Sequence, residues 1–116
     1  MMLPEAGQLL RIFLGESDRH EGRPLHEWLV LEARRRGLAG ATVLRGMSGF
    51  GAHSRLHTAK ILRLSEDLPV VVEIVDTPEK IADFLPVVDE VVTEGMATIE
   101  EVRIRIYRAP RPEAKA

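Results

Sequence analysis

The chain has 116 residues, of which 45% are hydrophobic and 29% are charged, and it carries a formal net charge of -2 and no cysteine. This length and composition indicate one folded domain and exclude disorder caused by low hydrophobicity over most of the chain. The lack of cysteine excludes disulfides, thiolate catalysis and thiolate metal sites, and the charge gives no reason to expect a nucleic-acid partner. The N-terminal residues lack a positively charged region followed by a long apolar run, so we expect a soluble, cytoplasmic protein.

The first half of the chain has the pattern of a strand, a helix and a second strand. Alternating residues predict a strand over Leu9–Leu14, followed by a polar loop over Glu16–Arg23. Pro24 suits the first position of a helix and Gly37 suits its end. The predicted core-facing residues of this helix are Leu25, Trp28, Leu29 and Ala33. A second strand is predicted over Gly40–Arg45.

Three later segments have extended patterns. Ile61–Leu64 has the pattern of a return to extended structure. Leu68–Val75 is β-branched and almost continuously apolar, which predicts a central strand with Pro69 at its start. The alternation over Val102–Tyr107 predicts the last strand.

A second helix is predicted before that last strand. Asp76 or Thr77 is its expected cap, Pro78 fits its first turn, and Gly95 is its expected end. The predicted apolar stripe comprises Ile81, Phe84, Leu85, Val88 and Val92. Because this stripe continues past Pro86, we expect a kink there and not the end of the helix.

This order of elements predicts an α+β fold of the ferredoxin-like βαββαβ type. Such a fold has a four-stranded antiparallel sheet with two helices on one face. We expect an N-terminal extension over residues 1–8, the domain over residues 9–108 and a flexible C-terminal tail over residues 109–116. The other sheet face would mix apolar and charged side chains, and it is expected to meet other subunits. The residues expected on that face are Arg11 or Phe13, Glu73, and Arg103 or Arg105.

The stretch Arg45–Lys60 has the residues of an anion-binding loop. Glycines allow a ligand to approach the backbone closely, and the basic side chains around them suit phosphate or carboxylate oxygens. The glycines are Gly46, Gly49 and Gly51, and the basic residues are Arg45, His53, Arg55, His57 and Lys60. The alternative is a long hairpin in which the glycines form bulges and the charges face water.

Other kinds of site have less support in the sequence. His53 and His57 are candidate metal ligands, but no acidic residue lies between Gly46 and Lys60 to complete a set. Ser48 or Ser54 is a candidate nucleophile, but the strand-turn-helix context is missing. The glycine pattern lacks the ending of a P-loop and the spacing of a Rossmann turn. We therefore predict a binding protein and not an enzyme.

Several segments together closely resemble the domain of unknown function 190 family, which is related to the PII signalling proteins and more distantly to CutA. The segments are Leu10–His20, Gly22–Leu25, Gly37–Gly46, Gly49–Gly51 and Leu68–Val75. The resemblance implies a ferredoxin-like homotrimer in which the loop after the second strand is equivalent to the PII T-loop. It also implies an adenine nucleotide in the cleft between subunits and a membrane channel or transporter as the regulated partner. Gly49–Gly51 is similar to the Gly-Phe-Gly sequence at the base of the T-loop, beside the nucleotide.

These observations together predict a trimeric regulator with a small anionic ligand of the nucleotide type. The predicted ligand-binding residues are Arg45, Gly46, Gly49, Phe50, Gly51, His53 and Arg55. The predicted partner-facing residues are Arg55, His57 and Lys60. No metal site is predicted; the alternative is a CutA-like protein linked to divalent metals through His53 and His57.

Overall fold

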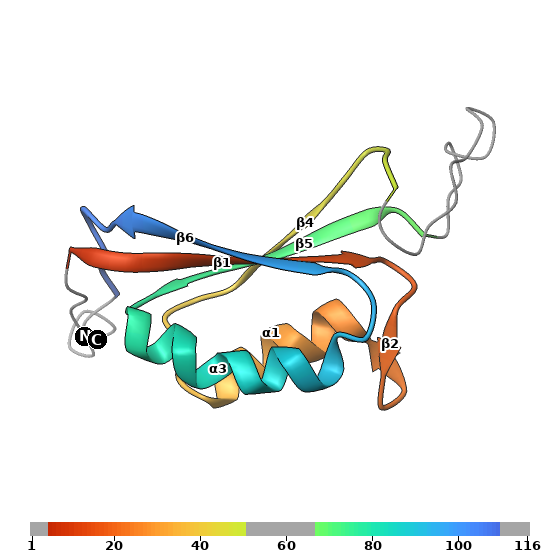
Figure 1. Cartoon of the computed structure of the whole chain (residues 1–116), viewed down its shortest axis with the longest axis horizontal. Coiled ribbons are helices and arrows are strands. Elements are labelled where there is room, and N and C mark those ends of the chain that lie inside the picture. Colours follow the sequence, from red (N-terminus) through yellow and green to blue (C-terminus); the bar gives the residue numbers. More distant parts are fainter. Residues whose placement is uncertain (1–4, 51–66, 110–116) are drawn as a thin grey trace, which may run out of the picture.

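The computed structural model describes residues 5–50 and 67–109 of the chain. The elements are β1 (Ala6–Gly15), β2 (Arg19–His20), β3 (Arg23–Pro24), α1 (Leu25–Arg35), β4 (Thr42–Arg45), β5 (Pro69–Asp76), α3 (Pro78–Val91) and β6 (Met96–Arg103). Four strands form one antiparallel sheet in the order β4-β5-β1-β6, and α1 and α3 cover one of its faces (Figure 1). The predicted α+β, ferredoxin-like fold is confirmed.

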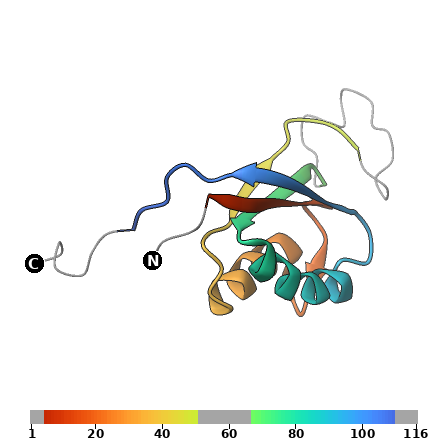
Figure 2. The ribbon, with the colours of Figure 1, turned by 60° about the vertical axis from the view of Figure 1, so that its left-hand side comes forward.

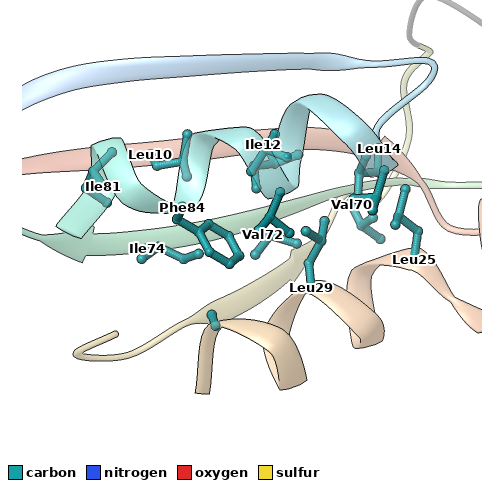
Figure 3. Packing of buried hydrophobic residues seen from close by; sticks show 14 residues of the cluster. Leu10, Ile12, Leu14, Leu25, Leu29, Val70, Val72, Ile74, Ile81 and Phe84 are labelled. Atoms are coloured by element: carbon teal, nitrogen blue, oxygen red, sulfur yellow. The ribbon is translucent and has the colours of Figure 1, made fainter. Parts of the chain in front are cut away.

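The core lies between the sheet and the two helices. Every second residue of β5 is buried, and so is every second residue of β1 from Leu10 to Leu14, because successive side chains of a strand point to opposite faces. The buried hydrophobic residues of the strands are Leu10, Ile12, Leu14, Val70, Val72 and Ile74. The buried helix residues are Leu25, Leu29, Ala33, Ile81, Phe84, Val87, Val88 and Val91. Figure 3 shows these side chains filling the space between the two layers.

The helix ends follow the capping signals in the sequence. Gly37 has φ +80° and follows α1, where the Leu38 N–H donates to the Ala33 carbonyl at 3.0 Å, as in a Schellman motif. Thr77 caps α3, because its hydroxyl accepts the Lys80 N–H at 3.1 Å. The helix α3 continues through Pro86, so this proline is not a boundary, and the kink stays a prediction.

The second helix is shorter than predicted. It ends at Val91 and not near Gly95, which lies in the turn before β6 with φ +138°. A Cβ atom at Gly95 would lie 2.4 Å from the Phe13 carbonyl oxygen, so this glycine permits a close backbone approach. Val87 and Val91 are additional core residues that the predicted stripe missed.

Other element boundaries also differ from the prediction. β1 begins at Ala6, before the predicted start at Leu9, because it pairs with β6 over its whole early part. The predicted polar loop after β1 contains the short β2–β3 hairpin. Trp28, predicted for the core, is only partly buried and lies edge-on to His20, with 4.6 Å between ring centroids.

The last strand was predicted in the wrong place. β6 spans Met96–Arg103, so most of the alternating run Val102–Tyr107 lies beyond the sheet. β6 is an edge strand with many exposed polar residues, and its pairing partner β1 lies at the other end of the sequence. The predicted extended segment Ile61–Leu64 lies outside the described residues, and the predicted division into extension, domain and tail stays a prediction.

Candidate functional site

The candidate site is the corner of the sheet where β4 ends and β5 begins. Gly46 follows β4, and its N–H donates to the Pro69 carbonyl at 2.7 Å. A Cβ atom at Gly46 would lie 2.9 Å from a Pro69 ring carbon, so the glycine allows the two chains to approach closely. Gly49 has φ +141°, a conformation that other residues rarely adopt. The two chain ends that flank residues 51–66 therefore leave the sheet from one place (Figure 1).

A turn after β1 lies against both of these chain ends. The Arg45 guanidinium donates to the Glu16 carboxylate at 3.1 Å, which joins the turn to the end of β4. The Glu16 N–H donates to the Leu68 carbonyl at 2.8 Å, which joins the turn to the start of β5. The Ser17 hydroxyl and N–H both donate to the Asp67 carboxylate, at 2.8 and 3.2 Å. The turn thus fixes the positions of the residues on either side of the 51–66 segment.

The described part of this corner is rich in carboxylates. Glu16, Asp18 and Asp67 all lie in the turn or against it, and Asp18 accepts the Gly15 N–H at 3.0 Å. The Arg45 side chain, predicted to bind an anion, is 60% exposed, and its guanidinium is ion-paired with Glu16. Its role in ligand binding stays a prediction, and its carboxylate partner was not predicted from the sequence.

The remaining predicted site residues divide into two groups. Arg45, Gly46, Gly49 and Phe50 lie at the described base of the loop, and the Phe50 side chain is exposed. The others lie outside the described residues, and they are Gly51, His53, Arg55, His57 and Lys60. Their predicted roles in ligand and partner binding stay predictions.

Neither α1 nor α3 covers the other face of the sheet (Figure 2). That face carries an ion-pair cluster on an apolar surface. Arg11 of β1 lies between Glu73 of β5 at 3.0 Å and Glu100 of β6 at 2.6 Å. The hydrogen bond to Glu73, with the nearby Glu100 charge, raises the pKa of Arg11. The apolar residues on this face are Leu9, Phe13, Leu44, Val71, Val75 and Met96, and three of them are exposed: Leu44, Val75 and Met96. We call this surface, with the ion-pair cluster, the open sheet face.

A second cationic region lies at the other end of the sheet. The end of β6 and the segment after it line a hollow of about 840 Å³ together with Glu5. The basic residues that line this hollow are Arg103, Arg105 and Arg108. Arg103 is ion-paired with Glu5, and the Tyr107 hydroxyl donates to the Ala39 carbonyl at 2.8 Å. The alternation predicted a strand with Arg103 or Arg105 on the face expected to meet other subunits, but Arg105 lies beyond β6. Three closely spaced arginines are also a signal for anion binding.

The described residues provide neither a metal site nor a membrane-crossing helix. Within residues 5–50 and 67–109, no group of three or more His, Asp or Glu side chains is arranged to hold a metal ion. His53 and His57, the ligands of the metal alternative, lie outside those ranges. None of the helices in the described ranges is long and apolar enough to cross a membrane.

The geometry defines a ferredoxin-like fold of the kind found in PII-like proteins. It is similar to a putative PII-like signaling protein from Thermus thermophilus, with a TM-score of 0.59 and 19% identity over 89% of this chain and 93% of that one. It is also similar to CPII from Thiomonas intermedia K12 bound to ADP and bicarbonate, with a TM-score of 0.55 and 18% identity over 85% and 88% of the two chains.

The chain belongs to the DUF190 family. The model of that family, described as Uncharacterized ACR, COG1993, matches residues 7–104. A UPF0166 protein from Aquifex aeolicus (strain VF5) is 41% identical over 99 residues, which cover 84% of this chain and 91% of the relative. A UPF0166 protein from Methanocaldococcus jannaschii is 35% identical over 98 residues, which cover 84% and 90%. The family resemblance stated from the sequence is confirmed.

Proposed function

We propose that this chain is a non-enzymatic PII-like regulator that binds a small anionic ligand of the nucleotide type at the base of the β4–β5 loop. The observation that carries this proposal is the construction of that base. Gly46 and Gly49 bring the backbone close to Pro69, and the turn after β1 fixes both flanking chains, so the base is a rigid platform for a ligand. Solved PII-like neighbours include CPII bound to ADP and bicarbonate, and CPII bound to ADP, AMP and acetate.

The proposed ligand contacts begin with the backbone around Gly49 and the Arg45 side chain, and they continue into Gly51, His53 and Arg55. Backbone N–H groups and guanidinium groups suit phosphate oxygens. His57 and Lys60, with Arg55, face the proposed partner, a membrane channel or transporter. We propose that the protein acts in the cytoplasm. A nucleotide ligand and the resemblance to PII-like regulators both suit that compartment.

The carboxylates at the loop base repel an anionic ligand, so the proposed site needs an additional source of positive charge. Arg103, Arg105 and Arg108 lie at the opposite end of the sheet from Gly46 and so do not reach the loop base of the same copy (Figure 1). In a trimer with the ligand in the cleft between subunits, the arginines of one copy would complete the loop base of its neighbour. The proposed site is therefore shared between two copies.

The open sheet face is the surface we propose for trimer formation. It combines exposed apolar side chains with an ion-pair cluster. Exposing such an apolar surface to water is unfavourable, and contact with further copies would bury it. Light scattering should give three times the chain mass of 13.0 kDa. Val75→Asp places a charge on this face and should lower the mass, whereas Leu31→Asp, at an exposed position of α1, should not. A wild-type mass equal to one chain would refute the trimer.

Calorimetry with AMP, ADP and ATP tests the ligand. Gly49→Ala should weaken binding at least tenfold, because φ +141° is strained for alanine and the loop base must shift. Gly22→Ala is the matched control, since Gly22 has φ +82° in the β2–β3 hairpin and open space around it. Absence of heat with every nucleotide, on correctly folded wild-type protein, would overturn the nucleotide proposal.

A further inference from the structure

The ion pair between Glu16 and Arg45 joins the candidate ligand site to the turn after β1, to whose carboxylate the proposed function gives no role in ligand choice. Arg45 ends β4, and Glu16 lies in the turn directly after β1, with 3.1 Å between their charged atoms. The pair is exposed on the Arg45 side, where 60% of the side chain is accessible. An ion pair of this kind contributes little to stability, so its main consequence is for the availability of the guanidinium.

The position of Glu16 is fixed by contacts other than the ion pair. Its N–H donates to the Leu68 carbonyl at 2.8 Å, and the next residue, Ser17, donates twice to Asp67. Gly15 allows this packing, because a Cβ atom there would lie 2.4 Å from an Asp67 carboxylate oxygen. The backbone therefore keeps Glu16 beside the loop base even when its side chain lets go of Arg45.

Among the described residues of one copy, the charge at this corner opposes a highly charged anion. Glu16 is ion-paired with Arg45, and Asp18 and Asp67 accept hydrogen bonds from the same turn, so three carboxylates lie at this corner. A ligand phosphate that binds Arg45 competes with the Glu16 carboxylate for the guanidinium, and it also meets the repulsion of that carboxylate. The repulsion grows with the number of negative charges on the ligand, whereas the competition weakens every ligand that uses Arg45.

We propose that Glu16 is a specificity-determining residue of the loop base, which competes with the ligand for Arg45 and disfavours ligands of high negative charge. This inference rests on the proposed function, because it concerns the ligand of the same site. It adds that the protein selects among anions by charge. The carboxylate that does so lies in the turn after β1 and not in the β4–β5 loop.

The experiment compares AMP, ADP and ATP without divalent cations, by calorimetry, on wild type and Glu16→Gln. Glutamine keeps the size of the side chain and removes its charge. Each ligand charge at about 8 Å, in a medium between protein surface and water, should change affinity about threefold. Two additional phosphates should therefore raise the ATP-to-AMP affinity ratio of Glu16→Gln about tenfold over wild type.

Two further variants separate competition for Arg45 from a general effect of net charge. Glu90→Gln makes the same charge change at an exposed position of α3, in the helix layer, and should change the ratio less than twofold. In an Arg45→Gln background, Glu16→Gln should still raise the ATP-to-AMP ratio, since direct repulsion remains, but it should raise the AMP affinity less than it does with Arg45 present, because no competition is relieved.

The outcomes distinguish this inference from the proposed function. If nucleotides bind but Glu16→Gln changes the ratio no more than Glu90→Gln does, the role of Glu16 is wrong and the ligand site stands. A rise in AMP affinity on Glu16→Gln that is equal with and without Arg45 also overturns the competition. If no nucleotide binds to wild type or to any variant, both the proposed function and this inference fall.

Discussion

Replacing Asp76 should destabilise the fold more than any other substitution of an acidic residue in the described ranges. Asp76 ends β5, and 1% of the residue is exposed. Among the described residues it is the one buried charged group. One carboxylate oxygen accepts the Ala39 N–H at 2.8 Å, and the other accepts the Thr77 N–H at 2.7 Å. It therefore holds the connection between α1 and β4 against the start of α3.

The magnitude follows from these two bonds. A hydrogen bond to a charged group contributes about 1.5–3 kcal/mol, and the bond to Thr77 is local and worth less. Asp76→Ala should therefore lower the free energy of unfolding by about 3 kcal/mol. With a urea m-value of about 1.5 kcal/mol/M, the midpoint should fall by about 2 M. Asp76→Asn should be intermediate, because its amide keeps one acceptor but turns an NH₂ group toward a donor.

Urea unfolding at one fixed protein concentration is the suitable assay, because association would otherwise change the apparent stability. Asp89→Ala is the matched control, at an exposed position of α3, and should stay within about 0.5 kcal/mol of wild type. If the midpoint of Asp76→Ala lies within about 0.5 M of wild type at an unchanged m-value, the reasoning about the buried carboxylate is refuted.

Three further substitutions test other contacts of the fold. Gly95→Ala should cost about 2–4 kcal/mol in thermal unfolding, because φ is +138° and a backbone oxygen lies 2.4 Å from the added Cβ; a cost no larger than that of Gly22→Ala would contradict this. Arg35, the last residue of α1, and Arg36, its C-cap, lower the pKa of Glu32 from 4.5 to about 2, by hydrogen bonds first. The ionised carboxylate therefore stabilises the fold fully above pH 4.5, and this contribution is lost as the pH falls to about 2. Glu32→Gln should cost up to about 1 kcal/mol at pH 7 and nothing near pH 2. A difference in urea unfolding that does not depend on pH would refute this link between ionisation and stability. Tyr107→Phe removes the bond to the Ala39 carbonyl and should cost about 1 kcal/mol in urea unfolding, whereas no change would show that this bond contributes nothing.

The sheet and its core could be predicted because their sequence patterns are local. Leu10, Ile12 and Leu14 alternate with half-buried residues, and β5 is rich in β-branched residues with Pro69 at its start, as predicted. The cap of α3 was also predictable, because Thr77 and Pro78 carry the capping signal in adjacent positions.

The errors occurred where the structure depends on distant partners. β6 forms because β1 offers it eight pairing positions, and neither the apolar content of β6 nor its neighbours in sequence indicate this. The strand pattern at Ile104 and Ile106 was stronger, yet no partner strand in the described ranges extends that far. Tertiary pairing decided against local propensity.

The candidate site was predicted only in its local half. The glycines and Arg45 are visible in one stretch of sequence, and the described ones lie together at the loop base. Glu16 is separated from Arg45 by 29 positions, and Ser17 from Asp67 by 50. Only the antiparallel register of β1 with β5 brings them together, so the polar segment after β1 could not be recognised as part of the site from its composition.

The hydrogen bond between Gly46 and Pro69 has a consequence for how the chain tolerates change in length. Because the folded sheet holds these two residues together, the scaffold fixes both ends of the segment that joins them. The entropy of closing a chain segment grows only with the logarithm of its length, so doubling the length costs about 0.6 kcal/mol. Insertions between Gly49 and Asp67 should therefore leave the stability of the domain almost unchanged, and the length and sequence of this segment can diverge while the core stays the same.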